Sequence, residues 1–133
     1  MIIGVGTDIV QIDRIGRAFL QRPEKFRKKI LAIEEIEKTP VSREIEYLAK
    51  RFAAKEAISK VLGTGMRLGV NFKDILILTD LETGQPLVQL RGRAKQQASE
   101  KGINRILISF SDEKEYAMAF AMGLSSYRER LDD

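Results

Sequence analysis

Apolar positions along the chain begin with the short period of a strand and then change to helical spacing. Residues 2–12 are rich in Ile and Val, which predicts a strand at the start of the chain. Residues 13–20 then show a helical pattern. Residues 24–38 predict one or two short helices, stopped before Pro40.

The longest helical pattern runs from Ser42 to Leu62. We expect Ser42 to cap the start of this helix, because its hydroxyl can accept a free backbone N–H. The Gly63-Thr64-Gly65 turn is expected to end it, since glycine favours the left-handed backbone that closes helices.

Strand-like patterns return in the second half of the chain. They cover residues 74–80, 86–91, 105–111 and 115–123, with a short polar helix predicted over 93–101. The hairpin-like spacing favours an antiparallel sheet packed against one long helix and several short helices. The predicted fold class is therefore α+β.

The last predicted strand is apolar on both of its faces. Alternating positions hold Tyr116, Met118, Phe120 and Met122 on one face and Ala117, Ala119 and Ala121 on the other. A strand of this kind is covered on both faces. Either another subunit provides the second cover, or the strand lies wholly inside one chain.

Composition narrows the chemistry that is open to the chain. Its 133 residues fit a single domain spanning 1–133, and they include no cysteine and no histidine. This excludes disulfides, thiolate nucleophiles, Cys/His zinc sites and histidine acid–base catalysis. What remains belongs to Asp, Glu, Lys, Tyr and water, and favours a hard cation such as magnesium.

Charge and hydropathy narrow the possible partners. The net charge of +4 suits an anionic partner but lacks the strong bias of a dedicated nucleic-acid binder. No apolar run is long enough to span a membrane, and no leader pattern stands at the N-terminus. We expect a cytoplasmic protein with neither nucleic-acid nor membrane partners.

Asp8 stands inside an otherwise apolar strand pattern. Period two places Gly4, Gly6, Asp8 and Val10 on one face. A buried carboxylate is costly unless it is paired or binds a cation, and the flanking glycines leave space for a ligand or a neighbouring backbone. The alternative is that Asp8 ends the strand or lies at a bulge.

Glu56 is the corresponding carboxylate in the long helix. It follows Ile45, Leu48 and Phe52 at near-helical spacing, so it continues an apolar stripe. Lys60 lies one turn later on the same side. The alternative is an ordinary ion pair between Glu56 and Lys60.

Two lysines lie close to the turn that ends this helix. Lys55 and Lys60, with the hydroxyl and amides of Gly63-Thr64-Gly65, suit phosphate oxygens. The glycines follow the helix rather than precede it, so this is not a P-loop. The alternative is plain capping of the helix C-terminus.

An early basic segment is a candidate docking surface. It contains Arg14, Arg17, Arg22, Lys25, Arg27, Lys28 and Lys29, interleaved with Phe19, Leu20 and Phe26. Such a surface can hold an acidic partner through charge and apolar anchors. The alternative is a solvated helix face.

Two of these segments resemble motifs of a known family. The GTDIV run at 6–10, followed by IDRI at 12–15, resembles the amino-terminal motif of holo-acyl carrier protein synthases. RFAAKEAISK at 51–60 resembles their second motif, followed in the same way by a Gly-Thr-Gly turn. The resemblance covers nearly the whole chain and implies a 4′-phosphopantetheinyl transferase-like fold.

The resemblance also implies an activity. These enzymes move the 4′-phosphopantetheine group from coenzyme A to a serine of apo-acyl carrier protein, in fatty acid biosynthesis. The second product is adenosine 3′,5′-bisphosphate. Members form trimers with active sites at subunit interfaces, so a homotrimer is expected here.

Residue roles follow from the matching positions. Asp8 and Glu56 become magnesium ligands, and together with Lys60 they form the expected catalytic group. The residues expected to bind coenzyme A are Lys55, Lys60, Gly63, Thr64, Gly65 and Pro86. Those expected to dock the carrier protein are Arg14, Arg22, Phe26 and Lys28.

Asp112 marks a departure from the family pattern. Many members carry a histidine where this chain has Asp112. We expect Asp112 to be a loop residue without a catalytic role. A rival hypothesis for the whole chain is a non-catalytic module that binds phosphate, nucleic acid or the carrier protein.

Overall fold

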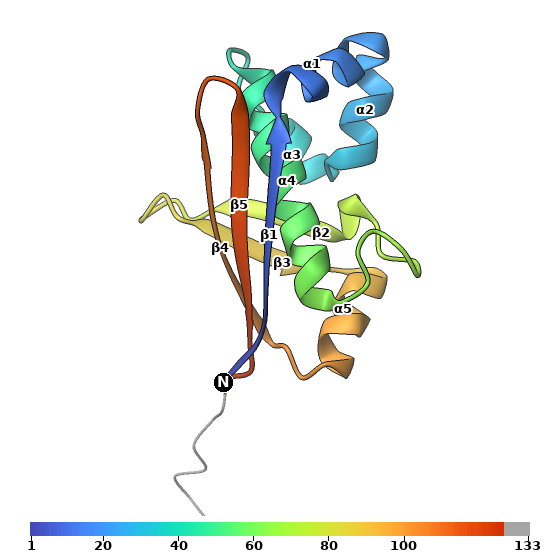
Figure 1. Cartoon of the computed structure of the whole chain (residues 1–133), viewed down its shortest axis with the longest axis vertical. Coiled ribbons are helices and arrows are strands. Elements are labelled where there is room, and N and C mark those ends of the chain that lie inside the picture. Colours follow the sequence, from blue (N-terminus) through green and yellow to red (C-terminus); the bar gives the residue numbers. More distant parts are fainter. Residues whose placement is uncertain (127–133) are drawn as a thin grey trace, which may run out of the picture.

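The computed structural model describes residues 1–126, and residues 127–133, the end of the predicted domain, lie outside the described residues. The elements in chain order are β1 (Ile2–Gln11), α1 (Ile12–Gln21), α2 (Pro23–Ile30), α3 (Ile33–Glu37), α4 (Glu44–Leu62), η1 (Phe72–Asp74), β2 (Ile75–Thr79), β3 (Pro86–Leu90), α5 (Gly92–Glu100), β4 (Arg105–Asp112) and β5 (Tyr116–Leu124). This order confirms the predicted α+β class (Figure 1).

The strands form two antiparallel sheets. The first has the order β1-β5-β4, and the second consists of the β2–β3 pair. The predicted closing hairpin is present as β4–β5, with Asp112 opposite Ala117. In the same sheet Asp8 of β1 lies opposite Ala119 of β5. Periodicity along single strands did not indicate this division into two sheets.

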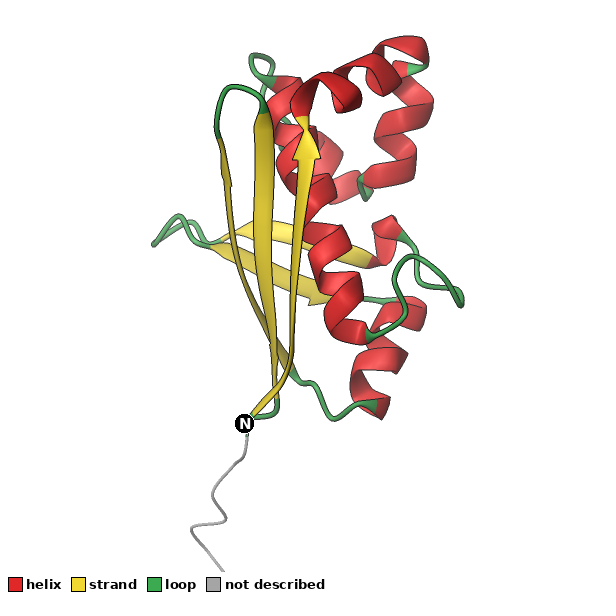
Figure 2. Ribbon diagram, in the orientation of Figure 1, coloured by secondary structure: helices red, strands yellow, loops and turns green. Residues whose placement is uncertain are grey.

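Helix α4 covers one face of the three-stranded sheet. It contacts β1, β4 and β5 (Figures 1 and 2). Small side chains permit this close packing, because Ala117, Ala119 and Ala121 of β5 are all buried toward the helix side. Apolar residues of α4, including Leu48 and Ile58, complete the core.

The other face of β5 is exposed. Tyr116, Met118 and Phe120 keep 42%, 49% and 37% of their surface accessible in the described part of the chain. The alternative that this strand is enclosed within one chain is therefore wrong for residues 1–126. The outer sheet face, defined here as the exposed apolar side chains of β1, β4 and β5, is left uncovered by the described part of the chain.

The sequence predicted one end of α4 correctly and the other end wrongly. The helix begins at Glu44, and Arg43 precedes it with a left-handed φ of 62°. Ser42 lies one residue further out and makes no capping hydrogen bond to the helix, so the predicted cap is wrong. At the other end, Gly63 adopts a φ of 81° and closes the helix as predicted.

Candidate active site

Asp8 projects from the middle of a continuous strand toward α4. The pairing of β1 with β5 is regular from Gly4 to Gln11, so Asp8 neither ends the strand nor lies at a bulge. Its side chain is 20% exposed. The period-two prediction for this face is confirmed, and the two local alternatives are excluded.

Gly6 explains how α4 comes so close to Asp8. A Cβ atom at Gly6 would lie 2.2 Å from the carbonyl oxygen of Ala57 and 3.1 Å from Cβ of Lys60. The space left by this glycine is therefore filled by helix backbone rather than by a ligand. Strand β1 and helix α4 meet at the turn that carries Glu56 and Lys60.

Glu56 is half-buried at this junction. Burial raises the pKa of its carboxyl, and the charge of Asp8 raises it further, while Lys60 and Arg14 act in the opposite direction. The Asp8 carboxylate thus lies close enough to Glu56 to oppose the ionisation of that carboxyl. A cation between them would relieve this repulsion.

Lys60 connects the helix to the strand. Its Nζ donates to the carbonyl oxygen of Thr7 at 2.7 Å and to Oδ1 of Asp8 at 3.4 Å. The predicted alternative, an ion pair between Lys60 and Glu56, is not formed, because the amine turns to Asp8 instead. Half of the Lys60 side chain stays exposed, so its amine is accessible to an anionic ligand.

Lys55 does not join this group, which corrects the prediction that it holds phosphate. Its side chain is 0% exposed, and its Nζ donates to Ile30 O at 2.6 Å, Glu35 Oε1 at 2.6 Å and Phe72 O at 3.1 Å. An ammonium has three donors, and all three are used. Burial lowers the pKa of Lys55 to about 8, against the opposite effect of Glu35.

The Gly63-Thr64-Gly65 turn is engaged with the helix end. The Gly63 amide donates to Lys60 O, and the amides of Thr64 and Gly65 both donate to Ser59 O. The Thr64 hydroxyl is buried and donates to Gly65 O. The capping interpretation is confirmed, and the prediction that this turn also binds phosphate stays a prediction.

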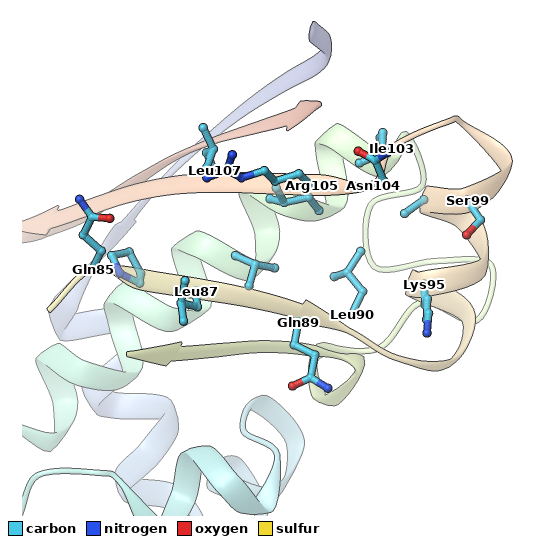
Figure 3. Close-up of a pocket in the computed structure, with 14 residues that line it drawn as sticks. Gln85, Leu87, Gln89, Leu90, Lys95, Ser99, Ile103, Asn104, Arg105 and Leu107 are labelled. Carbon is cyan, nitrogen blue, oxygen red and sulfur yellow. The ribbon is translucent and has the colours of Figure 1, made fainter. Parts of the chain in front are cut away.

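Pro86 lies in a different part of the chain from the carboxylates. It lines a groove of about 540 Å³ between β3 and β4, with Gln85 beside it and Lys95 and Arg105 further along (Figure 3). Neither Asp8 nor Glu56 lines this groove. A single chain therefore does not bring Pro86 into the same cavity as the carboxylate pair.

The predicted docking residues lie on α1, α2 and the link between them. Arg14, Arg22 and Lys28 are exposed, whereas Phe26 is half-buried edge-to-face against Phe19. Arg22 and Phe26 line a groove of about 370 Å³ together with Lys25 and Lys29.

Arg27 is the exception within this basic segment. It forms ion pairs with Glu24 and Glu44 and covers the ring of Phe19. Its charge is thus used inside the fold, unlike the charges of its exposed neighbours.

Asp112 ends strand β4 and is not a loop residue, which corrects that expectation. Its two carboxylate oxygens each lie 3.2 Å from a cation, one from Arg43 and one from Lys50. The side chain therefore ties both basic residues to the end of the sheet. Its lack of a catalytic role stays a prediction.

The described residues contain no group of three or more Asp, Glu, His or Cys side chains placed to hold a metal. A cation at Asp8 and Glu56 would take its remaining ligands from water or substrate oxygens. Within residues 1–126, no helix combines the length and apolar character needed to cross a bilayer.

The fold and the site together define an α+β protein with a carboxylate pair and an accessible amine where a strand meets a helix. A family model described as the 4′-phosphopantetheinyl transferase superfamily matches residues 4–121. The chain therefore belongs to this superfamily.

Individual relatives agree with this membership. A holo-[acyl-carrier-protein] synthase from Hydrogenovibrio crunogenus is 48% identical over 94% of this chain and 98% of its own length. The crystal structure of the Neisseria meningitidis synthase is 40% identical, with a TM-score of 0.85 over 93% of this chain and 99% of that one.

A third relative has been solved with a ligand. The holo-(acyl-carrier-protein) synthase from Bacillus anthracis, in complex with CoA (3′,5′-ADP), is 34% identical. Its TM-score is 0.77, over 95% of this chain and 99% of that chain.

Proposed function

We propose that the chain transfers the 4′-phosphopantetheine group of coenzyme A to a serine of apo-acyl carrier protein. The observation that carries this proposal is the meeting of Asp8, Glu56 and Lys60 at the β1–α4 junction of a chain from this superfamily. The names of the relatives and the ligand of the Bacillus anthracis structure support the same substrates.

The reaction breaks one phosphoanhydride bond. The serine oxygen forms a bond to the phosphorus of the pantetheine phosphate, and the bond from that phosphorus to the bridging oxygen breaks. Adenosine 3′,5′-bisphosphate leaves, and the serine proton passes to water or a carboxylate at the site. Phosphoryl transfer depends mainly on positioning and on charge stabilisation, and the accessible amine of Lys60 supplies positive charge for the phosphates.

Magnesium fits the carboxylates of this site. Asp8 and Glu56 offer hard oxygen ligands, and the raised pKa of Glu56 reflects burial and a like charge that a divalent cation would offset. Two protein ligands leave room for phosphate oxygens and water, as is usual for magnesium. The ion would supply charge neutralisation for the pyrophosphate.

The acidic carrier protein docks on α1 and α2 in this proposal. Arg14, Arg22 and Lys28 are exposed there and provide positive charge, while Phe26 adds apolar surface at the edge of the groove. The charge of Arg14 already affects Glu56. A partner bound on this surface would therefore present its serine close to the carboxylate pair.

A homotrimer with sites between subunits completes the proposal. The exposed Met118, Phe120 and Val5 of the outer sheet face offer an apolar surface for a second copy. Pro86, expected near the adenosine, lies in a groove apart from Asp8. A neighbouring subunit is the natural source of the missing part of the site.

The activity belongs to fatty acid biosynthesis in the cytoplasm, where the carrier protein is modified before it carries acyl chains. One experiment tests the transfer itself. The protein is mixed with coenzyme A, magnesium and apo-acyl carrier protein, and the carrier is examined by mass spectrometry. An added phosphopantetheine group supports the proposal, and an unchanged carrier with or without magnesium contradicts it.

A further inference from the structure

A buried ion pair lies directly beside Glu56 and has no role in the proposed mechanism. Lys55 and Glu35 are 0% and 1% exposed, and their side-chain atoms lie 2.6 Å apart. A buried pair of this kind is weak as a source of stability, because desolvation cancels much of its attraction. Its place next to a proposed metal ligand needs another explanation.

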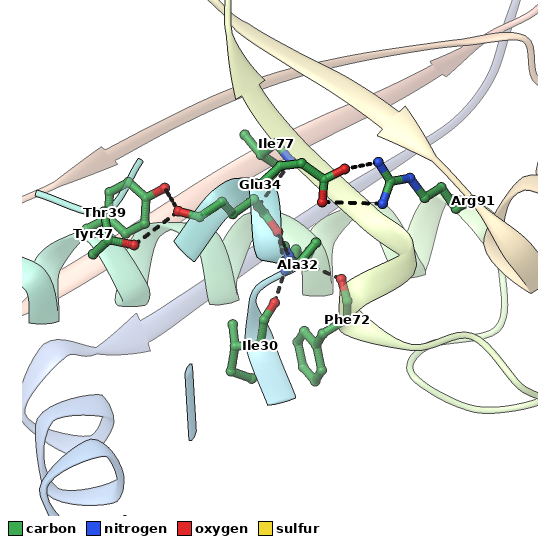
Figure 4. A network of polar contacts seen from close by, with 10 residues as sticks. Ile30, Ala32, Glu34, Thr39, Tyr47, Phe72, Ile77 and Arg91 are labelled. Carbon is green, nitrogen blue, oxygen red and sulfur yellow. Dashed lines mark hydrogen bonds and ion pairs between the residues drawn. The ribbon is translucent and has the colours of Figure 1, made fainter. Parts of the chain in front are cut away.

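Hydrogen bonds of the pair connect α4 to α2, α3, η1 and β2. Figure 4 labels Ile30, Phe72 and Ile77 among the partners. Lys55 donates to the carbonyl of Ile30 at the end of α2 and to that of Phe72 in η1. Glu35 of α3 accepts two backbone hydrogen bonds. Its Oε1 accepts from the Ala32 amide at 2.9 Å, and its Oε2 accepts from the Ile77 amide in β2 at 3.1 Å. The charges are therefore paired and surrounded by fixed backbone groups.

We infer that the Lys55–Glu35 pair is a positioning device that fixes the rotation of α4 and so places Glu56 against Asp8. This inference rests on the proposed function, because it assigns Glu56 a role in metal binding. Lys55 anchors the helix on the side of α2, α3 and β2, while Gly6 and Lys60 hold it against β1. The helical turn that carries Glu56 is thus held on two sides, by β1 and by the Lys55–Glu35 pair.

The geometry gives the size of the effect. Side-chain ends lie about 5–6 Å from a helix axis, so a rotation of about 10° moves a carboxylate by about 1 Å. Misplacement by about 1 Å can reduce a rate about 100-fold. Loss of a group that orients a metal ligand typically lowers metal affinity or activity about 10- to 100-fold.

Two variants test the device, Lys55→Met and the neutral double variant Lys55→Met/Glu35→Gln. The double variant removes the uncompensated buried charge that could unfold the single one. In whichever variant folds, we expect kcat to fall about 100-fold and the magnesium concentration for half-maximal transfer to rise about 10-fold. The KM for the carrier protein should change less than kcat, because no docking residue is altered.

Lys73→Met is the matched control, since it removes an exposed lysine beside Phe72. It should leave kcat and the magnesium requirement at wild-type values. Folded Lys55 variants that also keep both values would overturn the inference while leaving the proposed function standing. Failure of both variants to fold would overturn it too, because the pair would then serve stability alone. A wild-type protein without transfer activity would instead overturn the proposed function.

Chemical rescue distinguishes the loss of the Lys55 amine from other effects of substituting this residue. The chain has no cysteine, so Lys55→Cys introduces the only thiol. In the unfolded chain its thiolate displaces bromide from 2-bromoethylamine, which gives a sulfur analogue of lysine, and the protein is then refolded. We expect kcat and the magnesium requirement to return together. Recovery of the melting temperature without recovery of kcat would contradict the positioning role.

Discussion

Replacing Gly6 by alanine should disable the site although no charged residue is replaced. The added Cβ would lie 2.2 Å from the carbonyl oxygen of Ala57. Because carbon and oxygen need about 3.2 Å, β1 and α4 must separate by about 1 Å. Asp8, two residues along the strand, would then move away from Glu56, one residue along the helix.

The strain has a cost in stability and in rate. Overpacking of this kind costs about 1–3 kcal/mol, which corresponds to a fall in melting temperature of about 4–12 °C. A displacement of about 1 Å between the carboxylates should lower kcat about 100-fold. Thermal unfolding and steady-state transfer, followed by mass spectrometry of the carrier protein, measure the two effects.

Gly4→Ala is the matched control for this prediction. Gly4 lies on the same face of β1, but its Cβ would meet Val61 O at 3.5 Å, an ordinary contact. This variant should keep wild-type stability within about 1 kcal/mol and wild-type kcat. If Gly6→Ala behaved like Gly4→Ala in both assays, close approach of β1 and α4 would not be what sets the site.

Four further predictions concern separate parts of the molecule. In metal-free protein, Glu56→Gln should be more stable than wild type at neutral pH and equally stable below pH 4.5, as measured by urea unfolding. The reason is that the pKa of the Glu56 carboxyl is raised in the folded state, so the wild type loses stability as this carboxyl ionises. Met118→Asp should abolish the trimer in sedimentation experiments, and an unchanged trimer would refute the role of the outer sheet face. Arg22→Glu should raise the KM for the carrier protein about 10-fold at low salt with kcat unchanged, and a salt-insensitive KM in wild type would contradict electrostatic docking. Asp112→Ala should cost at most about 1 kcal/mol through its lost ion pairs and leave transfer intact, so a loss of turnover by orders of magnitude would assign it a catalytic role.

The spacing of residues predicted the positions of the two carboxylates, because spacing along a strand or helix sets the face on which each side chain lies. Period two predicted that Asp8 faces the core side of β1, and helical spacing predicted that Glu56 faces the same junction. Lys55 was misplaced although the same rule applies, since it lies about 140° around the helix from Lys60. The groups that bury it, on α2, α3 and η1, come from distant parts of the chain.

Other features had no signal in the sequence. Glu35 stands among Glu34 and Glu37 in a charged stretch, and only the folded chain distinguishes it as buried. The left-handed residue before α4 is Arg43 rather than a glycine, so Ser42 looked like the cap. Division into two sheets depends on long-range pairing, which local patterns do not encode.

The central claim is that Asp8 and Glu56 hold a divalent cation used in transfer. The most direct test measures the transfer rate against magnesium concentration for wild type, Asp8→Asn and Glu56→Gln, with folding checked by circular dichroism. We predict saturable activation of the wild type, no transfer without metal, and no transfer by either folded variant at magnesium concentrations that saturate the wild type. Transfer that is independent of magnesium, or variants that share the wild-type half-saturating concentration, would contradict the claim.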